Sequence, residues 1–259
     1  MPPSLPATPE PGVRSLQRAI DVLALFDERH PTRTVRDVVD GTGLPKTTAV
    51  RLLATLEGRG LVSRVAETTY SCGPALLRWV RLAEQMWQVS PAARAEMRGL
   101  VDRCGETVNV YVRQGLDRVC VAQEEGTATV RSVVPVGVPL PLGRGATAKV
   151  LLAGAPPGLL DELAGGDPGL DPAARAALVR EVDAVRSGGW AVSHGERELG
   201  ASAVAAPLAG ADGRVLAALS VSGPTSRFTD ERVPGYVEAV RAAAQAISRV
   251  GLGPVGAFL

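Results

Sequence analysis

Residues 34–64 read TVRDVVDGTGLPKTTAVRLLATLEGRGLVSR, a stretch that predicts two short helices joined by a tight turn. The first helix ends at residues 42–45, TGLP, because glycine suits a turn and proline suits the first position of the next helix. At about 100° per residue, the second helix has a polar arc that carries Thr47, Thr48, Arg51 and Thr55. The adjoining apolar arc carries Ala49, Leu52, Leu53 and Leu56. One face can therefore pack on a core while the other offers hydroxyls and a guanidinium to the phosphates and base edges of a major groove.

The flanking residues extend this pattern to a winged helix. Upstream, residues 13–28 predict a helix whose Leu16, Ile20 and Leu23 recur at the spacing of a buried stripe. Downstream, β-prone runs at residues 61–65 and 69–72 predict a hairpin. A helix, a pair of helices around a turn and a hairpin follow one another in this order in a winged helix-turn-helix domain.

A local basic cluster surrounds the second helix of the pair, although the net charge of the whole chain is only +1. The candidate DNA-binding residues are Arg33, Lys46, Thr47, Thr48, Arg51 and Arg64. Lys46 stands at the helix start, where it can hold a phosphate, and Arg64 stands on the wing. For Arg33, a solvated surface charge is an equal alternative. A pair of helices with a glycine turn also occurs in domains that never touch DNA.

A long helical pattern follows over residues 74–103 and is interrupted near Ser90-Pro91. Its first part has more apolar surface than a solvated linker needs, supplied by Leu76, Leu77, Val80, Leu82, Met86 and Trp87. This surface packs either against a partner molecule or on the chain's own domain, and the sequence leaves both alternatives open.

Beyond Gly105 the pattern changes to short β-branched runs separated by turns, with helices between them. Strands are expected at residues 108–112, 119–124, 130–134, 203–208 and 215–221. Helices are expected at residues 146–153, 171–187 and 229–250. The second of these begins with Asp171 as N-cap and Pro172 at its first position. The mixture predicts one α/β domain of the kind that binds ligands.

The composition favours a globular protein of a reducing compartment. With 46% hydrophobic and 21% charged residues among 259, the chain can bury a sizeable core. Its three cysteines form no CxxC pair, which argues against a disulfide framework. The proline-rich residues 1–12 are expected to be a disordered leader and not a signal peptide. No apolar run reaches the roughly 18 residues needed to cross a bilayer, so we expect a cytoplasmic protein without a membrane partner.

Enzyme motifs are incomplete throughout the sequence. His194-Gly195-Glu196 spells H-x-E without the PCxxC of zinc deaminases, and no serine lies in a GxSxG elbow. Residues 143–150 lack two positions of a phosphate-binding loop, and no cluster of His and Cys offers a metal site. The sequence therefore predicts no catalytic residue, no metal and no cofactor.

The chain resembles the IclR-type transcriptional regulators over nearly its full length. RSLQRAIDVLALF (14–26) and TGLPKTTAVRLLATLEGRGLV (42–62) carry the N-terminal pattern, and AKVLLA (148–153) and VAAPLAGADGRVLAALSVSGPTSRF (204–228) the C-terminal one. The resemblance implies an α+β fold. Its parts are a winged helix-turn-helix domain (13–73), a linker helix (74–90) and a GAF-like α/β domain for effector binding and oligomerisation (91–259). It also implies homodimers or homotetramers, a palindromic double-stranded DNA operator and a small organic acid as effector.

The resemblance carries several effector-binding positions over to this chain. Ser220 and Ser222 stand where the family places hydroxyls on a small carboxylate, and alternate residues of a strand share a face. An ordinary pair of strand serines is the alternative. Ala146 and Thr147 match small residues at a helix start, where backbone N–H groups can receive an anion. An apolar wall is expected from Leu140 and Leu142.

Two further pocket positions, Ser193 and Ala203, depart from the family. Some members carry an acidic residue at the first and a cysteine at the second, so an aromatic or larger acid fits this chain as well. We therefore expect a sequence-specific regulator whose operator affinity responds to a small organic acid. The alternative is a winged-helix interaction protein with a structural, ligand-free C-terminal domain.

Overall fold

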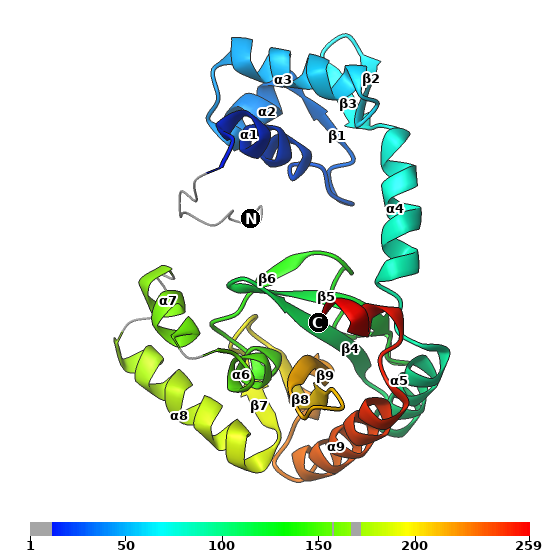
Figure 1. Ribbon diagram of the computed structural model, residues 1–259, viewed down its shortest axis with the longest axis vertical. Coiled ribbons are helices and arrows are strands. Elements are labelled where there is room, and N and C mark those ends of the chain that lie inside the picture. The colour runs from blue at the N-terminus through cyan, green and yellow to red at the C-terminus, as the bar shows by residue number, and fades with distance from the viewer. Residues whose placement is uncertain (1–11, 157, 167–171) are drawn as a thin grey trace. The chain divides into compact units, whose positions relative to one another are not determined.

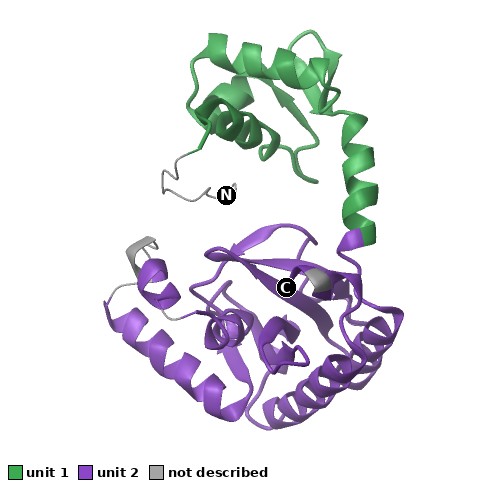
Figure 2. Cartoon of the chain, in the orientation of Figure 1, with its two compact units in different colours: residues 1–85 green, residues 86–259 purple. Residues whose placement is uncertain are grey.

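The computed structural model describes residues 12–156, 158–166 and 172–259. The chain divides into two compact units, residues 1–85 and 86–259 (Figure 2). Each unit combines helices with an antiparallel sheet, so the expected α+β fold class is confirmed. Residues 1–11 of the expected leader and the expected N-cap Asp171 lie outside the described residues. The finer division into wing domain, linker and effector domain stays a prediction. No described helix is long and apolar enough to cross a membrane.

The first unit holds three helices and a small sheet, followed by a fourth helix (Figure 1). In chain order these are α1 (Arg14–Leu23), β1 (Thr32–Thr34), α2 (Val35–Thr42), α3 (Lys46–Gly58), β2 (Val62–Ala66), β3 (Thr69–Cys72) and α4 (Ala75–Met86). β3 lies between β1 and β2 and is antiparallel to both. The predicted helix pair and hairpin are confirmed, and β1 is a third strand that was not predicted.

Local capping fixes where α2 begins and ends. The Thr34 hydroxyl accepts the Asp37 N–H at 3.1 Å, while the Asp37 carboxylate accepts the Thr34 N–H at 2.7 Å. Gly43 ends α2 at a φ of +66°, a left-handed conformation that glycine adopts without strain. Pro45 occupies the N-cap of α3, one position before the predicted one. The sequence of the turn thus ends α2 at Thr42 and begins α3 at Lys46.

The apolar stripe predicted for α1 is wrong for Leu16 and Ile20 and confirmed for Leu23. Leu16 and Ile20 are 59% and 52% exposed, whereas Val22 is fully buried and Leu23 packs beside it. The helix also ends at Leu23 and not at residue 28. Ala19, Val22 and Leu23, spaced i, i+3 and i+4, are the residues of α1 that pack on the core of this unit.

The apolar surface of α4 is exposed on the single chain. No residue of this helix is buried. The exposed fractions lie between 43% and 67% for Leu77, Trp79, Val80, Leu82 and Met86. Packing of this surface on the chain's own domain is therefore not observed, and packing against a partner stays a prediction.

The second unit is built on a six-stranded antiparallel sheet with the order β6-β5-β4-β9-β8-β7. Its strands are β4 (Thr107–Gln114), β5 (Asp117–Glu124), β6 (Pro139–Pro141), β7 (Ala191–His194), β8 (Ala201–Ala209) and β9 (Val215–Pro224). One face is covered by α5 (Pro91–Cys104) and α9 (Val233–Val250). The other face packs on α6 (Ala146–Ala153), α7 (Leu159–Gly166) and α8 (Pro172–Gly188) (Figure 1). Two short 3-10 helices are η1 (Thr225–Arg227) and η2 (Pro254–Phe258).

Several predictions for this unit are confirmed and two are wrong. The helix over residues 146–153 and the interruption at Ser90-Pro91 are confirmed, with Ser90 as the N-cap of α5. Residues 130–134 form no strand. The Val134 N–H donates to the Gln123 side chain at 3.0 Å, and the edge of β5 that these residues could have joined is paired with β6. The last helix begins at Val233, after a turn in which the Val233 N–H donates to the Thr229 carbonyl. β6, β7 and α7 were not predicted.

Candidate functional site

The exposed face of α3 carries three of the six predicted DNA-binding residues. Lys46, Thr47 and Arg51 are exposed, and Thr48 is half-buried at the edge of the same face. Ala49, Leu53 and Leu56 lie on the opposite side of the helix and are buried in the core of the unit. The amphipathic pattern thus orients α3 so that its polar residues can reach a major groove.

The other two predicted arginines have partners inside the unit. The Arg33 Nε donates to the Leu25 carbonyl at 2.7 Å, which gives Arg33 a structural role in the loop after α1. The Arg64 guanidinium lies 3.2 Å from the Glu57 carboxylate and 5.1 Å from the centre of the Tyr70 ring. The hydrogen bond and charge of Glu57 raise the pKa of Arg64. A phosphate at the wing would therefore have to share Arg64 with Glu57.

A pocket in the second unit brings together six of the eight predicted effector-binding residues. It is a small cavity of about 40 Å³ that opens to solvent. The predicted residues along its wall are Ala146, Thr147, Ser193, Ala203, Ser220 and Ser222. Leu140 and Leu142 are not among the lining residues, because Leu142 is fully buried in the core beneath α6 and Leu140 packs against that core.

The register of the sheet explains why these small residues meet. Ser193 of β7 lies opposite Ala203 of β8, which lies opposite Ser222 of β9. Ser220 lies two residues away on β9, opposite Asn109 of β4. Directly opposite residues share a face of the sheet, so one row of small side chains runs across three strands. The row leaves room between the sheet and the first turn of α6.

Arg118 and Arg197 are the charged lining residues that the sequence predictions missed. Arg118 lies on β5 and is only 2% exposed. Its Nη1 donates to the Pro141 carbonyl and, at 2.7 Å, to the Arg144 carbonyl. Its Nε has no hydrogen-bond partner among the described residues. Burial lowers the pKa of the guanidinium to about 10, and the nearby charge of Arg197 contributes in the same direction.

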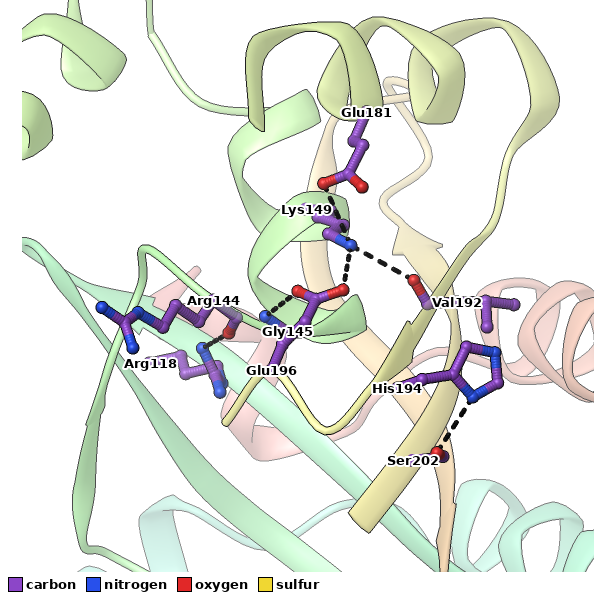
Figure 3. Close-up of polar contacts among 9 residues, drawn as sticks. All are labelled: Arg118, Arg144, Gly145, Lys149, Glu181, Val192, His194, Glu196 and Ser202. Atoms are coloured by element: carbon purple, nitrogen blue, oxygen red, sulfur yellow. Dashed lines mark hydrogen bonds and ion pairs between the residues drawn. The ribbon is translucent and has the colours of Figure 1, made fainter. Parts of the chain in front are cut away.

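A polar network joins the start of α6, the loop after β7 and α8 (Figure 3). Lys149 of α6 is 3% exposed, and its Nζ lies 2.6 Å from Glu196, 3.1 Å from Glu181 and 3.2 Å from the Val192 carbonyl. Glu196 also accepts the Gly145 N–H at 2.9 Å, at the start of α6. The loop after β7 is thereby tied to α6 and α8, and this loop carries Arg197 to the pocket wall.

His194, the histidine of the H-x-E motif, contacts a chain of two hydroxyls. The His194 Nδ1 lies 3.0 Å from the Ser202 hydroxyl, which in turn lies 2.8 Å from the Thr225 hydroxyl. Two hydroxyls in a row supply no carboxylate to orient the imidazole, as a hydrolytic triad requires. Over residues 12–156, 158–166 and 172–259, no group of three His, Cys, Asp or Glu side chains is placed to hold a metal ion.

Sequence comparisons cover both units. Residues 15–66 match the IclR helix-turn-helix domain, and residues 83–249 match the C-terminal domain of the bacterial transcriptional regulator IclR. The HTH-type transcriptional regulator KipR of Bacillus subtilis (strain 168) is 32% identical over 244 residues, which cover 91% of this chain and 96% of KipR.

Comparisons with solved structures likewise find IclR-family proteins. An IclR-family putative transcriptional regulator from Rhodococcus sp. is 49% identical, with a TM-score of 0.63 over 98% of this chain and 99% of that one. An IclR homologue from Microbacterium hydrocarbonoxydans, solved in complex with 4-hydroxybenzoate, shares the fold at 23% identity. Its TM-score is 0.73, over 94% of this chain and 99% of that one.

Proposed function

The chain belongs to the IclR family of bacterial transcriptional regulators, and from this membership we propose that a small organic acid bound in the second unit changes its affinity for a specific operator. DNA binding is assigned to the exposed face of α3, and acid binding to the pocket between α6 and the row of serines. The observation that carries the proposal is the pocket wall, which combines hydroxyls with two arginines beside the start of a helix.

On the DNA side, Thr47, Thr48 and Arg51 would meet bases or phosphates, and Lys46 would hold a phosphate at the start of α3. A homodimer would present two copies of α3 about 34 Å apart, one turn of duplex or a multiple of it. Such spacing suits a palindromic operator in the cytoplasm, and a homotetramer would pair two such dimers.

On the ligand side, an acid can change operator affinity only if it binds one arrangement of the subunits more tightly than another. α4 connects the two units along the chain, so an acid would act by favouring one orientation of this helix over another. The alternative of a structural, ligand-free domain is disfavoured by the pocket, because such a domain would be filled with side chains at Ser220 and Ser222. Catalysis is disfavoured because the relatives are named as regulators.

The test is a salt titration of binding to the DNA upstream of the protein's own gene, by fluorescence anisotropy, against a scrambled duplex. A preference for the native fragment that falls steeply as salt rises supports the proposal. In the same assay Arg51→Ala should weaken binding to the native fragment by about 1–3 kcal/mol. Arg113→Ala, which removes an exposed arginine of β4 in the other unit, is the matched control and should leave affinity unchanged.

Two results would contradict the assignment. Equal and weak binding to both duplexes would favour the winged-helix interaction protein. An unchanged affinity and footprint for Arg51→Ala would move base recognition away from α3.

A further inference from the structure

The pocket has an unbalanced charge. Arg118 and Arg197 both line it, whereas none of its described lining residues is an aspartate or glutamate. No carboxylate of the described residues lies within ion-pair distance of Arg118, whose hydrogen-bond acceptors are two backbone carbonyls. A buried cation with only neutral partners is costly to desolvate, and an anionic ligand would offset that cost.

Arg118 and the start of α6 converge on one place. The Arg118 Nη2 lies 3.4 Å from the position that a Cβ on Gly145 would take, and Gly145 is the N-cap of α6. Glu196 already accepts the Gly145 N–H. The N–H groups of Ala146 and Thr147 follow in the first turn, where no carbonyl inside the helix can accept them. A guanidinium and a helix start at the same point form a receptor for one acid group.

Arg197 supplies a second and separate cation. It lies in the loop between β7 and β8, and its side chain is 31% exposed. Its ion-pair partner is the adjacent Glu198, 3.3 Å away and 68% exposed, and an exposed pair of this kind contributes little. Glu196, the residue before it, is fixed to Lys149 at 2.6 Å, so the loop holds Arg197 at the pocket without neutralising it.

Lys149 does not belong to this receptor. Its Nζ is already paired with two carboxylates and a carbonyl, and its side chain is 3% exposed. Among the described lining residues, the cations that remain for a ligand are therefore Arg118, on β5, and Arg197, in the loop between β7 and β8.

We propose that the pocket selects acids with two anionic groups, the first bound by Arg118 and the first turn of α6 and the second by Arg197. This inference rests on the proposed ligand site and specifies its ligand class. A monoacid would leave Arg197 without a ligand charge, whereas a diacid would neutralise both guanidinium groups. Arg118 would set the affinity for any acid, and Arg197 the preference for diacids over monoacids.

The experiment is calorimetric titration of the full-length chain with matched pairs of acids, succinate with butyrate, glutarate with valerate and phthalate with benzoate. At least one diacid should bind about 10-fold more tightly than its monoacid, which corresponds to about 1.4 kcal/mol. Arg197→Gln should erase this preference and leave the monoacid affinity unchanged. Arg118→Gln should weaken both members of the pair by about 10- to 100-fold, as expected for charged hydrogen bonds. Arg98→Gln, at an exposed arginine of α5 on the other face of the sheet, removes the same charge and should change neither affinity.

Three outcomes would overturn the proposal. Monoacids could bind as tightly as their diacids, Arg197→Gln could keep the preference, or no acid of the panel could bind at millimolar concentration. The wild-type comparison and Arg197→Gln decide the matter even if Arg118→Gln does not fold. Operator binding is measured in parallel: specific DNA binding without any acid binding would reject the inference and keep the regulator. A diacid that binds without changing operator affinity would reject the effector role and keep the anion site.

Discussion

Replacement of Lys149 by methionine tests whether the loop beside the pocket is held by a buried ion pair. Methionine keeps the length and most of the volume of the apolar stem, so little cavity is created. The change removes the contacts of Nζ with Glu196, Glu181 and the Val192 carbonyl (Figure 3). Removing one partner of a buried ion pair costs about 3–5 kcal/mol.

That cost is reduced at this site because the carboxylates are not fully buried. Glu196 and Glu181 are 31% and 50% exposed, so water can solvate them once Lys149 is gone, and Glu196 keeps the Gly145 N–H. We expect the free energy of unfolding to fall by about 2 kcal/mol. Urea unfolding with an unchanged m-value gives the magnitude. Hydrogen exchange should show the loss of protection concentrated in α6 and residues 195–200.

A double-mutant cycle isolates the pair. Glu196→Gln removes the partner charge, so adding it to Lys149→Met should cost less than the sum of the two single changes, by about 1 kcal/mol. Lys46→Met is the control, since Lys46 is the only other lysine of the sequence and is exposed. It should stay within about 0.5 kcal/mol of the wild type. A change of that small size for Lys149→Met would refute the reasoning.

Two further predictions concern buried or capped carboxylates. The Thr34 N–H and hydroxyl hold the pKa of Asp37 below its usual range. Asp37 therefore contributes stability above its unfolded pKa of about 3.9. That stability is lost as pH falls through the lower pKa of the folded state. Asp37→Asn should flatten the acid limb of the melting temperature plotted against pH; an unaltered limb would place the effect elsewhere. Glu106, which is 1% exposed, accepts two N–H groups of Arg227, whose side chain is 27% exposed, so Glu106→Gln should lower the free energy of urea unfolding by about 3 kcal/mol. A loss below about 0.5 kcal/mol would show that water replaces the pair without cost.

Elements with strong local signals could be predicted from the sequence, but the face that a helix buries could not always be. Residues 146–153 are apolar helix formers bounded by Gly145 and Gly154, and the observed helix has the same bounds. α1 offers two possible apolar faces, one through Leu16 and Ile20 and one through Ala19 and Val22. Only packing against α3 decides between them, and it buries the second. Periodicity alone carries no information about that choice.

The candidate site shows the same division between local and non-local information. The family pattern identified Ser220 and Ser222, because alternation along one strand places both on one face. Arg118 was missed because the predicted strand began at residue 119, which left Arg118 outside the strand. Arg197 lies in a loop whose position depends on the Glu196–Lys149 contact, between residues 47 positions apart. No local sequence pattern predicts such a contact.

The two buried cations of the second unit show why Arg118 is assigned to a ligand. Lys149 and Arg118 are 3% and 2% exposed, so both lose their hydration in the folded chain. Lys149 offsets that cost by pairing with two carboxylates of the chain. Arg118 donates to two carbonyls, and its Nε has no hydrogen-bond partner in the described part of the chain. A residue kept for stability alone would gain from a carboxylate or from replacement by an apolar side chain. An acid in the pocket would supply the missing charge and stabilise the folded unit by RT ln(1 + [L]/Kd). Thermal stabilisation by a bound acid should therefore vanish in Arg118→Gln and persist in Lys149→Met. This comparison separates Arg118, which binds the acid, from Lys149, which stabilises the fold.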